Sequence, residues 1–167
     1  MIVDHPTYLI SELAGDVVAL VKEMRQRFNP NHDWPVDITI AGSSGIGTIK
    51  EGQDINEVIK AFQPIIDLHG FTEVTFASVS RFPNTGIYYL APERGNFDAL
   101  HKAIAGSEIQ FNYNQWPYNP HCTLRAGAEP TDECDLLFNS MSAPGNSMIE
   151  CFSLYQPYSG GGRVHRF

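Results

Sequence analysis

The sequence predicts a mixed fold of helices and strands, α/β or α+β. Segments with the two-residue alternation of a strand take turns along the chain with segments whose apolar residues recur at helical spacing. The chain has 167 residues, enough for one sizeable hydrophobic core, and no linker or low-complexity stretch divides it, so residues 1–167 are expected to form a single domain. Apolar residues make up 43% and charged residues 18% of the chain, a balance that favours a globular fold over disorder.

The first half of the chain predicts two strands and two helices. Residues 7–12 are expected to form a short strand, and residues 14–28 carry apolar side chains mostly at helical spacing. Two prolines within residues 29–35 end that helix. Residues 36–42 alternate polar and apolar side chains, as in a strand with one face of each kind. After a loop rich in glycine and serine, Asp54 is expected to cap a helix with an apolar stripe.

The second half predicts a hairpin, two helices and further strands. Residues 71–82 and 86–92 are predicted as strands joined by a turn. Asn96 is expected to cap the next helix and Gly106 to end it. The remaining predicted elements are a strand at 121–127, a short helix at 132–140, and strands at 148–155 and 162–167. Each half thus contains a helix followed by a strand of pattern x-h-Thr-h, where h is apolar.

Composition and charge narrow the classes of function. The formal net charge of −8 argues against binding a long nucleic acid through its phosphates, but it allows one small phosphate ester in a locally positive cleft. No apolar run approaches the roughly 20 residues of a membrane span, and we expect no signal peptide because the first residues lack a basic segment. Three cysteines without CxxC spacing are typical of a reducing compartment. We therefore expect a cytoplasmic monomer that does not associate with membranes.

Two of the predicted strands place polar side chains on one face. In one of them His121, Thr123 and Arg125 alternate with apolar neighbours. His121 can act as a general acid or base near neutral pH, the Thr123 hydroxyl can donate to a phosphate oxygen, and Arg125 would add a charge-assisted contact. In the other strand Asp37 and Thr39 share a face in the same way.

These polar faces line one groove if the two halves pair about a pseudo-twofold axis. The arrangement suits attack of water on a cyclic phosphodiester, because one group accepts the proton of water, another protonates the leaving oxygen, and the hydroxyls bind the non-bridging oxygens. The alternative for each residue is an ordinary solvent-facing or β-forming role. The other histidines show no metal-ligand spacing, and we expect neither a metal nor a cofactor.

The two strands also resemble the signatures of a known family. PHCTLRAG at residues 120–127 resembles the second signature of the two-histidine phosphoesterases, a proline followed by His-h-Thr-h; this superfamily contains the 2′-5′ RNA ligase and cyclic phosphodiesterase-like proteins. PVDITIAG at residues 35–42 lies where the first signature is expected. FPNTGIYYLAP resembles the middle hairpin of the family, and SLYQPYSGGGRVHRF resembles its C-terminal strands, so the resemblance extends over nearly the whole chain.

The resemblance implies an α+β fold with two pseudo-symmetric lobes of antiparallel-rich sheets, flanked by helices, around a central groove. It also implies metal-independent hydrolysis of a 2′,3′-cyclic or 2′-5′-linked nucleotide or RNA-end phosphodiester, with roles for His121, Thr123 and Thr39. Arg125 and Tyr158 are the expected substrate-binding residues, and Tyr158 would stack on a base at the mouth of the groove.

Asp37 is the departure from the family pattern, which has a histidine at this position. An aspartate can accept a proton, and burial or a nearby anion would raise its pKa toward a useful range. It cannot supply an imidazolium, and losing one proton-transfer partner costs roughly 10²–10⁴-fold in rate. The chain is thus an active enzyme with Asp37 as base, a slow enzyme, or a protein that binds a nucleotide or phosphoester without turnover. His32 or His165 would compensate if either entered the groove, and a non-nucleotide phosphoester is an alternative substrate.

Overall fold

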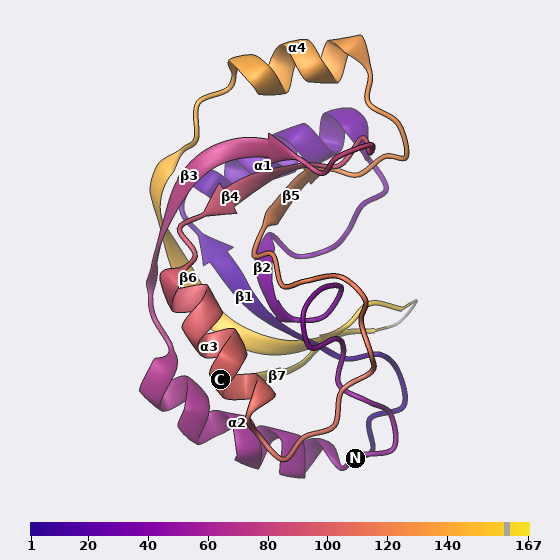
Figure 1. Ribbon diagram of the computed structural model, residues 1–167, viewed down its shortest axis with the longest axis vertical. Helices are drawn as coiled ribbons and strands as arrows, with labels where there is room; N and C mark the ends of the chain where they lie inside the picture. Colours follow the sequence, from indigo (N-terminus) through magenta and orange to yellow (C-terminus); the bar gives the residue numbers. More distant parts are fainter. Residues whose placement is uncertain (159–160) are drawn as a thin grey trace.

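The computed structural model describes residues 1–158 and 161–167 and shows strands and helices in the predicted order (Figure 1). The described strands are β1 (Tyr8–Ala14), β2 (Asp37–Ala41), β3 (Glu73–Arg81), β4 (Tyr88–Pro92), β5 (Cys122–Arg125), β6 (Gly145–Gln156) and β7 (Gly162–Arg166). The described helices are α1 (Asp16–Phe28), α2 (Ile55–His69), α3 (Gly95–Ala105) and α4 (Asp132–Ser140).

The strands form one antiparallel sheet with the order β2-β1-β6-β3-β4-β5, and β7 also pairs with β6. The long strand β6 pairs with β3 through residues 145–148 and with β1 through residues 148–155. It therefore belongs to both halves of the sheet and joins a lobe containing β1, β2 and β7 to a lobe containing β3, β4 and β5. The fold is α+β, as the family resemblance implied.

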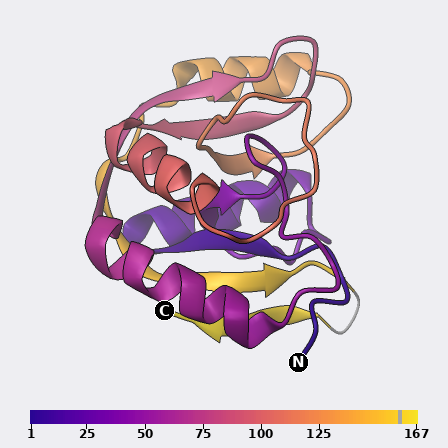
Figure 2. The ribbon, with the colours of Figure 1, turned by 60° about the horizontal axis from the view of Figure 1, so that its bottom comes forward.

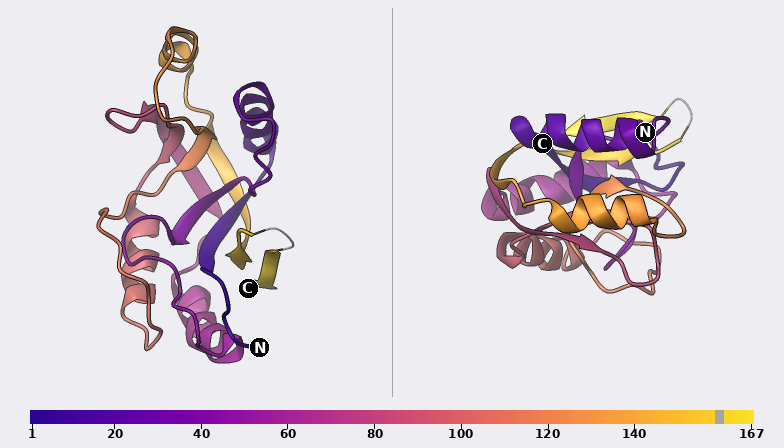
Figure 3. Two further views of the ribbon diagram at one scale, coloured as in Figure 1. Left: turned by 90° about the vertical axis from the view of Figure 1, so that its right-hand side faces the viewer. Right: turned by 90° about the horizontal axis from the view of Figure 1, so that it is seen from above.

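The two ends of the sheet, β2 and β5, approach each other although they are far apart in strand order (Figure 1). Helix α1 contacts both β1 and β5, so it packs across the junction of the two lobes. Figure 3 shows α1 and α4 at one end of the molecule and α2 and α3 at the other. Both chain termini lie near α2, as Figure 2 shows.

Alternation along β2 and β5 separates a core face from a polar face. Ile38 and Ile40 of β2 are fully buried, as are Cys122 and Leu124 of β5. Thr39, between the two isoleucines, and Thr123, between Cys122 and Leu124, are partly exposed. Because successive side chains of a strand point to opposite faces, burying the apolar set in the core turns the polar set toward the space between the lobes.

One of the two predicted N-terminal helix caps is present in the structure. Asp54 caps α2 as predicted, since its carboxylate accepts a hydrogen bond from the Asn56 backbone N–H at 2.9 Å. Gly106 ends α3, but the expected cap at Asn96 is wrong. Helix α3 starts at Gly95, so Asn96 lies within its first turn, and no side chain caps this end. No helix of the described residues has the length and apolar character needed to cross a membrane.

Candidate active site

A cavity of about 160 Å³ lies where β2 and β5 meet. Its lining residues are Tyr8, Arg25, His32, Trp34, Asp37, Thr39, Ser43, His121 and Thr123. In another protein, a cavity of about 150 Å³ admits one benzene molecule, so this one suits a phosphate group rather than a whole nucleotide. All four side chains expected to act in catalysis line the same cavity: Asp37 and Thr39 from β2, Thr123 from β5, and His121 from the position just before β5.

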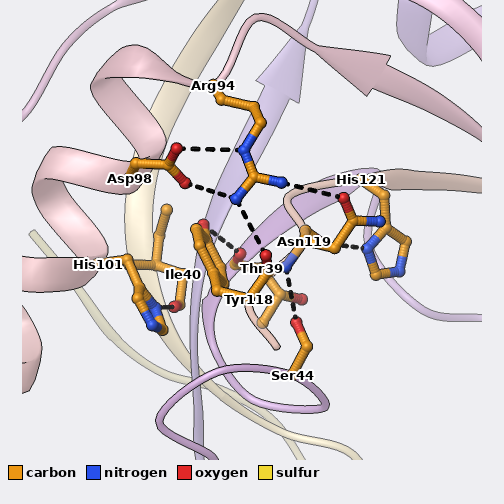
Figure 4. A network of polar contacts seen from close by, with 9 residues as sticks. All are labelled: Thr39, Ile40, Ser44, Arg94, Asp98, His101, Tyr118, Asn119 and His121. Carbon is orange, nitrogen blue, oxygen red and sulfur yellow. Dashed lines mark hydrogen bonds and ion pairs between the residues drawn. The ribbon is translucent and has the colours of Figure 1, made fainter. Parts of the chain in front are cut away.

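His121 directly precedes β5, and its ring orientation is determined by the backbone. The Nδ1 atom lies 2.7 Å from the Asn119 carbonyl oxygen (Figure 4). A carbonyl can only accept, so the proton resides on Nδ1, and Nε2 keeps a free lone pair. Burial lowers the pKa of His121, partly offset by the hydrogen bond to the Asn119 carbonyl. At neutral pH the imidazole is therefore a neutral group that can accept a proton at Nε2.

The loop that orients this imidazole is held by helix α3. Arg94 at the start of α3 donates to the Tyr118 carbonyl at 3.0 Å and to the Asn119 side-chain oxygen at 3.4 Å, and it also pairs with Asp98 (Figure 4). The Tyr118 hydroxyl donates to the Thr39 carbonyl at 3.1 Å. One network therefore ties the loop before β5 to strand β2, and it sets the imidazole relative to the opposite strand.

Asp37, in β2, also lines the cavity, and 5% of its surface is exposed. Its carboxylate accepts hydrogen bonds from Trp34 Nε1 at 2.7 Å and from the Thr39 hydroxyl at 3.2 Å. Burial raises the pKa of Asp37 from its ordinary value of 3.8 to about 7, although Arg25 and the two hydrogen bonds favour the ionised form. A substantial share of Asp37 is therefore protonated near neutral pH.

The two threonines differ in how their hydroxyls are engaged. The Thr39 hydroxyl already donates to Asp37. The Thr123 hydroxyl makes no hydrogen bond to any described residue, and Thr123 lines the cavity. Thr123 is therefore the threonine whose hydroxyl is free to donate to a bound oxyanion.

Sequence reasoning missed Arg25, which also lines the cavity. The sequence did contain an indication: Arg25 lies four residues after Val21 and next to Met24, so a charged residue interrupts the apolar stripe of α1. Of the two histidines considered as compensating groups, His32 does line the cavity, and burial lowers its pKa. His165 lies in β7 against Phe167 and is not part of the lining.

The structure does not bring the two expected substrate-binding residues into the cavity. Arg125 donates from its guanidinium to the carbonyl oxygens of Gly86 and Glu129, each at 2.8 Å. The ring of Tyr158 stacks on His5 with centroids 3.8 Å apart. Strand alternation placed Arg125 on the face of Thr123, but its long side chain turns to loop carbonyls that need a donor.

Comparison with solved structures shows the class of fold. Over 98% of this chain and 97% of the other, the structure resembles Escherichia coli LigT complexed with 3′-AMP, with a TM-score of 0.53 and 15% sequence identity. It resembles TT0787 of Thermus thermophilus over 97% and 96% of the two chains, with a TM-score of 0.54 and 15% identity. A structure described as a phosphoesterase matches with a TM-score of 0.55 and 16% identity, over 98% and 97% of the chains. The protein thus has a LigT-like α+β fold.

The model of the 2′-5′ RNA ligase superfamily matches residues 12–151. The chain therefore belongs to this superfamily. No curated protein matches it in sequence. Family and fold together support a phosphoesterase or RNA-ligase-like function.

Proposed function

We propose that this protein hydrolyses a 2′,3′-cyclic or 2′-5′-linked nucleotide or RNA-end phosphodiester in the cavity between β2 and β5, by acid–base catalysis without a metal. The observation that carries the proposal is that His121, next to β5, and Asp37, in β2, line one phosphate-sized cavity. The nucleotide class is supported by the family and by the 3′-AMP complex of E. coli LigT.

The roles of the two groups follow from their protonation states. His121 is the general base, because its Nε2 lone pair is free and its neutral form is favoured. Asp37 is the general acid, because its protonated form is populated near pH 7. The reverse assignment, with Asp37 as base, requires a buried carboxylate and a protonated imidazole together, and burial disfavours both.

In the proposed reaction, water attacks phosphorus while its proton passes to His121 Nε2. The new P–O bond forms as the P–O bond to the leaving ribose oxygen breaks, and the proton of Asp37 passes to that oxygen. The Thr123 hydroxyl donates to a non-bridging oxygen, on which charge develops, while the Thr39 hydroxyl keeps its hydrogen bond to Asp37. Proton exchange with solvent then returns the imidazolium and the carboxylate to their starting forms.

Binding without turnover is the second candidate, and the hydrogen bonds of Asp37 favour it. Both oxygens of the Asp37 carboxylate accept hydrogen bonds, as an ionised group would, and in that form Asp37 would repel a phosphate and donate no proton. A nucleotide that binds but is not cleaved would identify this case.

The test is hydrolysis of 2′,3′-cyclic mononucleotides and 2′-5′ dinucleotides from pH 5 to 9 with a chelator present. Wild type is compared with His121→Ala and with His69→Ala, a control that removes an exposed histidine at the end of α2. We expect turnover in wild type and His69→Ala, and a loss of roughly 10²–10⁴-fold in His121→Ala. Nucleotide binding without turnover in all three would support the binding alternative, and neither binding nor turnover would overturn the substrate class.

A further inference from the structure

We infer that Arg25 is the anion-binding residue of the cavity, where its guanidinium holds a phosphoryl oxygen of the bound ester. The identity of the ester rests on the proposed function. The anion site itself rests on the geometry and charge of the cavity wall. Arg25 belongs to neither signature strand, and it reaches the cavity from α1.

The guanidinium of Arg25 is held in place by three backbone carbonyls. Its Nε donates to the Thr123 oxygen in β5 at 3.0 Å, and Nη1 donates to the oxygens of Trp34 and Pro35, just before β2, at 2.7 and 3.0 Å. Nη2 makes no hydrogen bond to any residue that the structure describes. Because the guanidinium is planar, fixing Nε and Nη1 also fixes the direction of the N–H groups on Nη2.

The charge of Arg25 is buried without a direct counter-ion. Only 5% of the residue is exposed, and none of the ion pairs among the described residues includes it. Burying a charge without a partner is costly, and neutral carbonyls offset that cost only in part. Asp37 is close enough for the charge of Arg25 to favour its ionised form, but burial keeps a substantial share of it protonated near neutral pH. An anion in the cavity would provide the full counter-charge that Asp37 does not. The site is thus a local positive centre in a chain with a formal net charge of −8.

Arg25 also accounts for how a cavity containing Asp37 attracts a phosphate. An aspartate cannot supply the positive charge of an imidazolium, and Arg25 supplies a permanent positive charge in the same cavity.

The test is a titration with inorganic phosphate, followed through the fluorescence of Trp34, which lines the cavity. Trp116 is 63% exposed, so Trp116→Phe removes the background signal. In that background Arg25→Gln is compared with Lys22→Gln, which removes an exposed charge from the same helix. We expect phosphate affinity to fall at least about 10-fold in Arg25→Gln and to stay unchanged in Lys22→Gln. Equal affinity in the two variants would overturn the inference.

A second measurement covers the case in which Arg25→Gln does not fold, because it needs no substitution at that position. Phosphate is added to the wild-type protein labelled with ¹⁵N, and the arginine Nε–H resonances are recorded. We expect the Arg25 resonance to shift and that of Arg125, which faces loop carbonyls, to stay in place. An Arg25 resonance that does not respond at saturating phosphate would contradict the inference.

The two proposals fail in different ways. If phosphate binding depends on Arg25 but wild type cleaves no ester, the proposed function is wrong and the anion site stands. If wild type cleaves the ester and Arg25→Gln keeps the same KM, the anion-binding role is wrong and the proposed function stands.

Discussion

Strands β2 and β5 share one sequence pattern but carry different chemistry at its first position. In β2 this residue is Asp37, buried and hydrogen-bonded by the Trp34 and Thr39 side chains, whereas next to β5 it is His121, hydrogen-bonded by a backbone carbonyl. Burial raises the pKa of the carboxyl group and lowers that of the imidazole, because in each case it disfavours the charged form. The comparison teaches that two unlike groups in similar surroundings become a neutral acid and a neutral base.

The largest expected effects come from removing the Asp37 carboxyl group or the His121 imidazole. We expect His121→Asn and Asp37→Asn each to lower kcat/KM by roughly 10²–10⁴-fold, because each removes one proton transfer. In wild type, activity should rise with pH as His121 loses its proton and fall above about pH 7 as Asp37 loses its proton.

The shape of the pH–rate profile distinguishes the two variants. His121→Asn should lose the acidic limb, and Asp37→Asn should lose the alkaline limb. If Asp37→Asn instead loses the acidic limb, Asp37 is the base and the proposed roles are reversed. Circular dichroism of both variants checks that the fold is retained.

Replacing Thr123 or Thr39 should have a smaller effect on activity than replacing His121 or Asp37. Thr123→Val removes a free donor, and we expect about a 10-fold fall in kcat/KM with an unchanged pH profile. Thr39→Val also removes a hydrogen bond that favours the ionised form of Asp37. The pKa of Asp37 should then rise further, and the alkaline limb should move to higher pH. The same pH profile in both variants would show that Thr39 does not tune Asp37.

The pH dependence of stability tests the burial of Asp37 without any substrate. Folding raises the pKa of Asp37 from 3.8 to about 7, so the folded state binds the proton more tightly. The stability linked to this proton is fully present below about pH 4 and is lost as the pH rises through about 7. The free energy of unfolding of wild type relative to Asp37→Asn should fall by up to about 4 kcal/mol over that range. Urea denaturation at several pH values measures this difference, and a constant difference would contradict the raised pKa.

Arg125 provides the smallest expected effect on activity. Its guanidinium donates to two loop carbonyls outside the cavity, so Arg125→Ala should leave KM unchanged. It should lower the free energy of unfolding by about 1 kcal/mol, because two carbonyl acceptors lose their donor. A large rise in KM would restore the substrate-binding role that the sequence first indicated for it.

Local sequence patterns predicted the order of strands and helices because each pattern reflects the period of its own backbone. The alternation in β2 and β5 correctly placed Thr39 and Thr123 in one cavity, since a residue's face on a strand depends only on its position. The cap at Asp54 was equally predictable from a few neighbouring residues. The family resemblance added the meeting of the two strands at one groove, which no local pattern contains.

Only the tertiary structure decided what long or distant side chains do. Arg125 has a long, flexible side chain and Tyr158 lies far from both signature strands in the sequence, and each contacts a partner outside the cavity. Arg25 reached the cavity only because α1 packs across the junction of the lobes. The sequence by itself determined which side chains lie on the polar faces of β2 and β5. Their burial, and with it the raised pKa of Asp37, depends on how closely the two ends of the sheet approach, which no local segment specifies.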